Sequence, residues 1–430
     1  MPAAAQAVPL AERTRRKISR RLVPFVFLLY IVAYLDRANV AFAKLNMTAD
    51  LRFSEAVFGF GAGIFFIGYL VLEIPGALLV ERWSARKWMA RILITWGLCT
   101  VWIGFVRTPG QFYLARFLLG LAEAGFFPGI IVYMTHWFVS QDRARAMAGF
   151  ITAIPVSLAL GAPISAALLK ANWFGLAGWR WIFILQGLPA VLLGLITIFY
   201  LTDHPREAKW LEPEERAWIA GELEAEKRRK RAAGHISAWQ ALRHRDVLLL
   251  AVALSCANIG SYAYAFWLPT TLRRASGFSI PVATAFASLP YVAGFLSVLW
   301  SGRDSDRTRE RKLHAAIPLL VAAACFTLSA LPGQPFPLVL LWLCLTSAAG
   351  YMFPPPFWVL PTLVLGESAA AASIGLINAI GNLGGFVGPS VVGYLLTSNY
   401  SYTTAMIFLA CGYLTAGLLL LTVRIRRDPV

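Results

Sequence analysis

The sequence predicts an all-α integral membrane protein with twelve transmembrane helices, arranged as two six-helix bundles. Three observations support this fold class. Hydrophobic residues make up 58% of the 430 residues, whereas charged residues make up only 14%, compared with roughly 25% in soluble domains. Long apolar runs recur along the whole chain, and one charged motif occurs twice, six runs apart. So few charges cannot cover the surface of soluble domains of this size.

The apolar runs define the expected helices. About 20 helical residues cross the roughly 30 Å of a bilayer core, and only helices or closed barrels satisfy their backbone hydrogen bonds in lipid. Strand-like alternation is missing from these runs, so we expect helices. The twelve predicted spans are 22–44, 56–80, 88–106, 111–138, 147–169, 180–200, 247–269, 281–301, 313–331, 338–360, 369–395 and 402–423.

The distribution of Lys and Arg predicts the orientation. The side that holds the N-terminus collects 30 of these residues, whereas the opposite side holds six. Because cytoplasmic loops are enriched in Lys and Arg, both termini and the long 201–246 segment are expected in the cytoplasm. The first apolar run is too long for the core of a signal peptide.

The spans divide the chain into five parts. The 201–246 segment contains the only stretch that reads as a soluble amphipathic helix, and it separates six spans from six. The expected parts are a basic N-terminus (1–21), an N-terminal bundle (22–200), a cytoplasmic linker (201–246), a C-terminal bundle (247–423) and a cytoplasmic tail (424–430).

Two matching loop motifs indicate an internal repeat. An acid-Arg-x3-Arg-Lys pattern starts at Glu81, after the second span, and again at Asp306, after the eighth. Parallel six-helix repeats are typical of one transporter architecture. These loops resemble the cytoplasmic loop motif of the major facilitator superfamily. The resemblance implies a cytoplasmic latch between helix ends, built from Glu81, Arg82, Arg86, Asp306, Arg307 and Arg311.

Composition and motifs exclude several other functions. The net charge of +17 could suit nucleic acid, but the basic residues lie between apolar spans, so no nucleic-acid partner is expected. The five cysteines lie in apolar stretches without a CxxC pair, which indicates neither disulfides nor a metal site. Walker, HExxH and GxSxG motifs are missing from the sequence. We therefore expect no cofactor, no metal and no enzymatic activity.

A few charged residues lie at membrane depth, where ionisable groups are costly and indicate function. Asp36 and Arg37 lie near the middle of the first span, and Arg116 and Glu123 lie in the fourth. The latter two are seven residues apart, so they share a helix face at a separation of about 10 Å. Because buried ions persist when paired, we expect ion pairs between these spans. Lys44 lies near a span end, where a lysine can snorkel to the interface.

Such a set of charges can couple a proton to an anion. Protonation of the acid would free its arginine, and a free guanidinium can bind a substrate carboxylate through two parallel hydrogen bonds. Apolar surroundings favour the protonated form of a carboxyl group. The alternative is a static ion-pair network that fixes helix packing.

Four segments carry a more specific resemblance. They are YLDRANVAFA, EIPGALLVERWSARKWMARI, RFLLGLAEAGFFPG and FWVLPTLVLGESAAAASIGLINAIGNLGGFVGP. Over nearly all of 20–425 the chain resembles the anion:cation symporter branch of the superfamily, near bacterial tartrate, phthalate and hydroxyphenylacetate permeases. The resemblance implies that Asp36 and Glu123 carry protons, that Arg37 binds substrate carboxylate and that Arg116 is a charge partner. We place Arg37 and Arg116 together in the expected substrate-binding site.

The C-terminal half has no charge at membrane depth, so polar and aromatic residues must complete the site. Asn378 and Asn382 share a helix face and could bind substrate hydroxyl groups or join two helices. Candidates for walls that stack on the substrate, or for core packing, are Tyr34, Tyr262, Tyr264 and Trp358. Glu73 could act in the inner gate or pair with a neighbouring helix end.

The combined prediction is a monomeric transporter in a bacterial inner membrane. It would import a small organic carboxylate by proton symport, through alternating access of the two bundles. An electroneutral anion exchanger and a proton-coupled efflux antiporter remain as alternatives. The aromatic candidates suit a benzoate-like acid, and the asparagines suit a hydroxy acid such as tartrate.

Overall fold

The computed structural model describes residues 9–82, 84–139, 142–143, 146, 152–232, 244–365 and 367–424, and within them every regular element is a helix. The N-terminal half contains α1 (Leu10–Leu51), α2 (Glu55–Arg82), α3 (Ala85–Ile103), α4 (Pro109–Glu123), α5 (Phe126–Trp137), α7 (Ala153–Leu168) and α8 (Gly178–Tyr200). The helix α9 (Pro213–Ala232) follows it. The C-terminal half contains α11 (Arg245–Ser276), α12 (Ile280–Phe286), α13 (Ser288–Thr308), α14 (Lys312–Ser329), α15 (Phe336–Met352), α16 (Pro354–Phe357), α17 (Leu360–Leu365), α18 (Glu367–Thr397) and α19 (Tyr402–Thr422).

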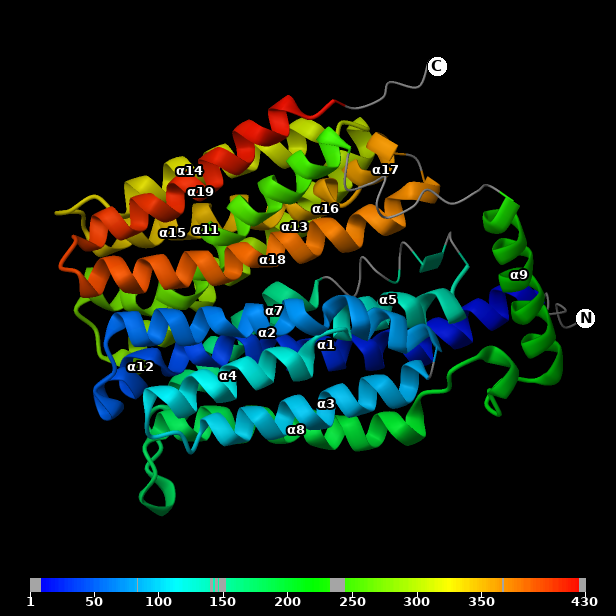
Figure 1. The fold of residues 1–430 in the computed structure, drawn as a ribbon, viewed down its shortest axis with the longest axis horizontal. Helices are drawn as coiled ribbons and strands as arrows, with labels where there is room; N and C mark the ends of the chain where they lie inside the picture. The colour runs from blue at the N-terminus through cyan, green and yellow to red at the C-terminus, as the bar shows by residue number, and fades with distance from the viewer. Residues whose placement is uncertain are drawn as a thin grey trace, which may run out of the picture.

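The two halves form separate bundles with the same internal packing. In the first, α1 packs against α7 and α8, and α4 packs against α2 and α3. In the second, α11 packs against α18 and α19, and α15 packs against α13 and α14. Corresponding helices therefore have corresponding neighbours, as a parallel repeat requires. Figure 1 shows the two bundles one above the other, with the start of α1, the end of α19 and α9 toward the same side of the molecule. We call this the terminal side and its opposite the distal side.

The twelve predicted crossings are recovered, although not all are equally apolar. Ten stretches of the described residues are helical, long and apolar enough to cross a membrane. The other two crossings are α3, whose first turns carry Arg86, Lys87 and Arg91, and α7, which is shorter at 16 residues. The fold is thus a twelve-span helical membrane protein.

The fourth predicted span is not one continuous helix. The 111–138 run is divided between α4 and α5 at Ala124 and Gly125. Gly125 has a φ of 83°, in the left-handed region that glycine adopts without a Cβ clash. The tenth span, 338–360, is likewise divided among α15, α16 and α17 around a run of three prolines. Proline lacks the N–H that a continuous helix requires.

The halves meet along three sets of helices: α2 with α18, α7 with α12 and α13, and α1 with α11. Two glycines bring α2 and α18 close together near the distal side. A Cβ on Gly59 would lie 2.3 Å from the Pro389 carbonyl oxygen, and one on Gly393 would lie 2.4 Å from that of Glu55. Side chains larger than hydrogen cannot fit this contact, so backbone packing joins the halves here.

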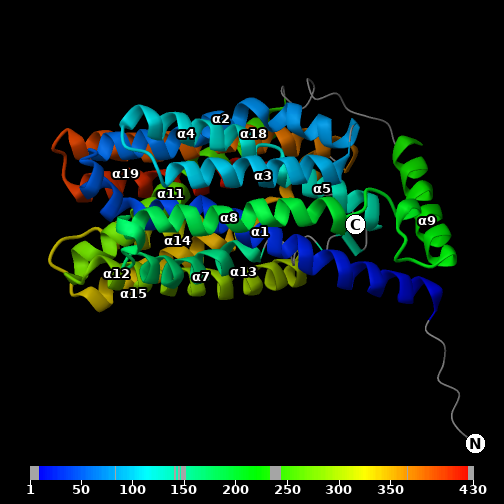
Figure 2. The same cartoon turned by 90° about the horizontal axis from the view of Figure 1, so that it is seen from below.

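The helix α9 lies across the terminal side of the N-terminal half, away from the bundle core (Figure 2). Its Glu215 side chain is buried and pairs with Lys17 at 2.9 Å and with Arg13 at 3.2 Å, both from the first turns of α1. Burial by itself would raise the pKa of Glu215, but the backbone N–H of Glu212 and the two cations lower it overall. The linker helix is therefore attached to α1 by charge.

Candidate functional site

Asp36 lies in the interior of the N-terminal bundle. It is 1% exposed. Its carboxylate accepts hydrogen bonds from Thr100 of α3 at 2.7 Å and from Asn39, one turn further along α1, at 2.8 Å. Sequence reasoning did not find Thr100 or Asn39. The available signal was the i,i+3 spacing of Asn39 from a buried acid.

Arg37 and Glu123 form the ion pair expected between the first and fourth spans. Arg37 Nε donates to Glu123 Oε1 at 2.6 Å, and the two side chains are 17% and 2% exposed. Glu123 is the last residue of α4, so the helix break that follows it helps to set its position. The Arg37 guanidinium lies 5.2 Å from the ring centres of both Tyr34 and Tyr69, which surround it with aromatic faces.

Arg116 has a different partner from the one expected. Its side chain is fully buried, and it donates to the backbone carbonyls of Gly61 at 3.3 Å and Ala62 at 3.2 Å on α2. The backbones of α2 and α4 are very close, since a Cβ on Gly120 would lie 2.0 Å from the Phe65 carbonyl oxygen. This proximity exposes α2 carbonyls to the guanidinium. Arg116 stays within electrostatic reach of Asp36 and Glu123 but joins two helices and does not line the cavity.

A cavity of about 240 Å³ lies between the two halves. Tyrosine is the most frequent residue type in its lining, which contains eight of the fourteen tyrosines of the chain. Three of these eight tyrosines were identified as candidates from the sequence. The others could have been found, because tyrosine is usually concentrated at the membrane interfaces and a tyrosine in the middle of a span is therefore a candidate site residue. The predicted site residues that line the cavity are Tyr34, Arg37, Tyr262, Tyr264, Trp358, Asn378 and Asn382.

The cavity tyrosines differ in how firmly they are held. Tyr264 donates its hydroxyl to the Leu343 carbonyl at 2.9 Å, so it is anchored to α15. Tyr262 packs its ring against Phe66 of α2 at 4.4 Å between centres, across the two halves. Tyr34 packs edge-on against Tyr30, one turn away, at 4.9 Å. The cavity wall is therefore aromatic on both sides.

Glu73 meets the two asparagines of α18. Asn378 Nδ2 donates to Glu73 Oε1, and Asn382 Nδ2 lies 3.5 Å from Glu73 Oε2. Glu73 is 5% exposed. The structure thus places the candidate gate residue and the candidate substrate-binding asparagines in one contact between the halves.

The loop motifs are described only in part. Arg86 donates its backbone N–H to Asp203 at 2.8 Å, next to the Ser84 cap of α3, which donates to the same carboxylate. Arg311 donates to Ser305 at 2.9 Å, and Arg307 is exposed. The side chains of Glu81, Arg82 and Asp306 lie outside the described residues. The cytoplasmic latch therefore stays a prediction.

Lys44 does not snorkel. Its side chain is fully buried, 2.9 Å from Glu55 of α2. Its ammonium lies 4.1 Å from the ring centre of Trp267, which belongs to α11 in the other half. Nearby, the Ala56 backbone N–H donates to Thr397 of α18 at 2.8 Å. The sequence could not show that this lysine faces the partner half, and it forms part of the distal contact between the halves.

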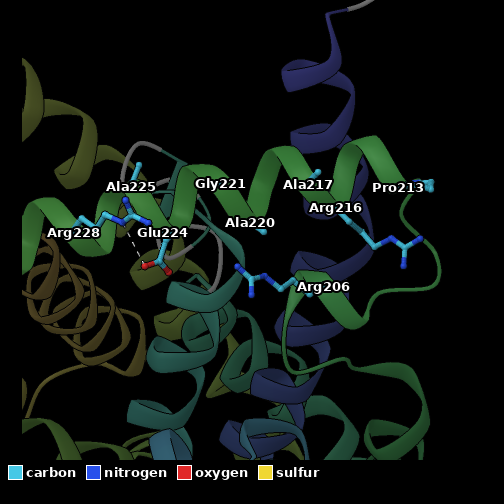
Figure 3. A pocket seen from close by; sticks show the side chains of 9 residues that line it. All are labelled: Arg206, Pro213, Arg216, Ala217, Ala220, Gly221, Glu224, Ala225 and Arg228. Atoms are coloured by element: carbon cyan, nitrogen blue, oxygen red, sulfur yellow. Dashed lines mark ion pairs between the residues drawn. The ribbon is translucent and has the colours of Figure 1, made fainter.

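A separate open hollow lies along α9 (Figure 3). Its side chains include Arg206, Arg216 and Arg228, and Arg228 lies 3.7 Å from Glu224. The hollow lies on the linker helix, outside the two bundles, so it does not contribute to the cavity between them. Across the described residues, no group of three His, Cys, Asp or Glu side chains is placed to hold a metal ion.

Two repeated six-helix bundles around a cavity define the class of the protein, because substrate sites of secondary transporters lie at such repeat interfaces. The chain is a multi-pass membrane transporter and not an enzyme. Residues 26–389 match the Major Facilitator Superfamily. The chain belongs to this superfamily.

Several known proteins are similar along nearly the whole chain. Two proteins of Agrobacterium vitis named "Putative tartrate transporter" are 42% and 43% identical over 421 residues, which is 98% of this chain and 93% and 96% of theirs. The "Quinolone resistance transporter" of Acinetobacter baumannii is 38% identical, over 92% of this chain and 91% of that protein. A solved bacterial homologue of the human lysosomal transporter Spinster, inward-facing and unoccupied, shares the fold with a TM-score of 0.74 at 16% identity, over 95% of each chain.

Proposed function

We propose that this transporter imports a small organic carboxylate by proton symport, through alternating access of its two halves. It would work as a monomer in a bacterial inner membrane with both termini in the cytoplasm. One observation carries the proposal: a guanidinium that lines the cavity is paired with a buried carboxylate outside the lining. The names of the two Agrobacterium relatives support a hydroxy-carboxylate as the substrate.

The pair of Arg37 and Glu123 supplies the coupling. Arg37 donates one hydrogen bond, from Nε, to Glu123. A guanidinium has five N–H donors in total, so four remain that can face Tyr69 and the cavity. A proton on Glu123 removes the charge that holds Arg37 and releases the guanidinium for a substrate carboxylate. Asp36 is the second proposed proton carrier, one residue earlier on α1 and hydrogen-bonded on the far side of the helix from the cavity lining.

Uptake into proteoliposomes tests this function. Labelled tartrate should accumulate against its gradient when the outside is made acidic, and accumulation should stop when an ionophore collapses the pH gradient. Uptake that does not depend on the pH gradient would contradict proton symport and favour an electroneutral exchanger. Arg37→Ala should abolish saturable uptake, because no other cation lines the described cavity.

Efflux is the second candidate function, since the quinolone-resistance relative is 38% identical and the cavity wall is aromatic. An efflux antiporter would export an aromatic drug in exchange for protons. Cells that express the transporter should then show a raised inhibitory concentration for a quinolone. An unchanged inhibitory concentration, together with acid-driven tartrate uptake, would exclude efflux of that drug.

A further inference from the structure

The structure already contains a carboxylate bound by the two cavity asparagines, and it is the protein's own. Each oxygen of Glu73 faces one asparagine amide: Oε1 accepts from Asn378 and Oε2 faces Asn382. Asparagine amides supply N–H donors, whereas an ionised carboxylate only accepts. Two amides one helical turn apart therefore match the two oxygens of one carboxylate, and a hydroxyl group would fill only one of the two positions.

The same amides can be reached from the cavity. Asn378 and Asn382 line it together with Arg37, whereas Glu73 does not belong to the lining. Glu73 comes from α2 and the asparagines come from α18, so the contact also joins the two halves. A second carboxylate that enters the cavity would meet donors that Glu73 occupies.

We infer that the two asparagines form a second carboxylate subsite, that Glu73 fills it while the cavity is empty, and that the transported anion is a small dicarboxylate that displaces Glu73. The inference rests on the proposed function, in which Arg37 binds the first carboxylate. Two carboxylates cannot share these donors, because like charges repel strongly in a buried site. Binding of the second carboxylate therefore breaks a contact between α2 and α18, and this links dicarboxylate recognition to movement of the halves.

Two ligands of the same length test the subsite. Tartrate has two carboxylates, whereas threonate has the same four-carbon skeleton with a hydroxymethyl group in place of one of them. Isothermal titration of the purified full-length transporter should give a Kd for tartrate about tenfold lower than that for threonate, as expected for hydrogen bonds to a charged group. Replacement of both asparagines by alanine should abolish this preference. Asn258→Ala is the matched control, because Asn258 also lines the cavity but donates its amide to the Gly381 backbone carbonyl at 2.9 Å and not to a carboxylate; the ratio should stay as in the wild type.

Glu73→Ala separates competition from a structural role. Loss of an internal competitor should lower the Kd for tartrate severalfold and leave that for threonate nearly unchanged, whereas loss of a structural support would weaken both ligands. Glu73→Gln keeps the size of the side chain and can still accept a hydrogen bond without the charge, so it should fall between the wild type and Glu73→Ala.

The inference is overturned if the wild type binds both ligands equally, if the asparagine variant still prefers tartrate, or if Glu73→Ala binds tartrate no more tightly. It is also overturned if neither ligand binds. The proposed function has a separate outcome: uptake of a monocarboxylate that requires Arg37 and the pH gradient would leave carboxylate symport standing without the second subsite.

Discussion

Substitution of Lys44 by methionine should weaken the distal contact between the two halves. Methionine is also unbranched and only one atom shorter, but it removes the ammonium, which lies 4.1 Å from the Trp267 ring centre. The Glu55 carboxylate then loses its partner, but its side chain is 32% exposed and can be hydrated. The variant should therefore fold, with a bias toward states in which the distal side is open.

The magnitude follows from what crosses the interface. At 2.9 Å the Lys44–Glu55 pair has an attraction of about 6 kcal/mol at an effective dielectric constant of about 20, but desolvation offsets most of it and both residues belong to the same half. The contact with Trp267 is the part that joins the halves, and a desolvated cation–π contact contributes about 2 kcal/mol. A methionine sulfur on the same ring recovers about half of this. The net loss of about 1 kcal/mol corresponds to roughly a fivefold shift in the equilibrium.

Spin-label distances can measure this shift. Gly110 on α4 and Ser398 after α18 are exposed on the distal side, and a Cβ on Gly110 meets open space. Labels on cysteines at these positions, in a chain whose five free native cysteines are replaced, should show a larger long-distance population with Lys44→Met. Lys170→Met, an exposed distal lysine, is the matched control. An unchanged distance distribution, or an equal change in the control, would refute the role of Lys44.

Three further predictions concern Gly120, Arg116 and Glu215. Gly120→Ala should lower the unfolding free energy by about 1–3 kcal/mol, seen as a lower melting temperature, because its Cβ would lie 2.0 Å from an α2 carbonyl; Gly110→Ala, in open space, should not. Arg116→Gln should reduce the melting temperature without changing substrate Kd, because Arg116 joins two helices, whereas Arg37→Gln should raise Kd; the opposite pattern would exchange their roles. The pKa of Glu215 is lowered in the folded protein, so its ionised carboxylate stabilises the docking of α9. This stabilisation is complete at a pH above the ordinary glutamate pKa of 4.5 and is lost as the pH falls below that value. Proteolysis of α9 in the wild type should then be fast only at acidic pH, whereas in Glu215→Gln it should be fast at every pH. A pH-independent rate of proteolysis in the wild type would contradict this.

The spans and the repeat could be predicted because they depend on properties of long segments. The length of an apolar run identifies a membrane crossing whatever its neighbours are. The two matching charged loops, six spans apart, showed that the second half repeats the first. The Arg37–Glu123 contact could also be anticipated, since buried charges of opposite sign require partners. The breaks were less visible. Gly125 and Pro128 indicated the interruption of the fourth span, but glycine and proline are also frequent in continuous membrane helices.

Contacts that depend on the spacing between helices could not be predicted. Arg116 donates to backbone carbonyls because Gly120 allows α2 and α4 to approach closely. The pattern of charges in the sequence contains no information on this distance between helices. The contact of Glu73 with Asn378 joins residues 305 positions apart in the chain. Its existence depends on how the two halves pack, which the sequence of neither helix specifies alone.

Proton coupling through Glu123 is the central claim, and Glu123→Gln tests it most directly. Wild-type and variant transporters in proteoliposomes would be compared in two assays: tartrate accumulation driven by an imposed pH gradient, and counterflow of labelled tartrate without a gradient. The neutral amide should abolish gradient-driven accumulation while counterflow continues, because Arg37 can still bind the anion. Accumulation at the wild-type level in Glu123→Gln would contradict the claim.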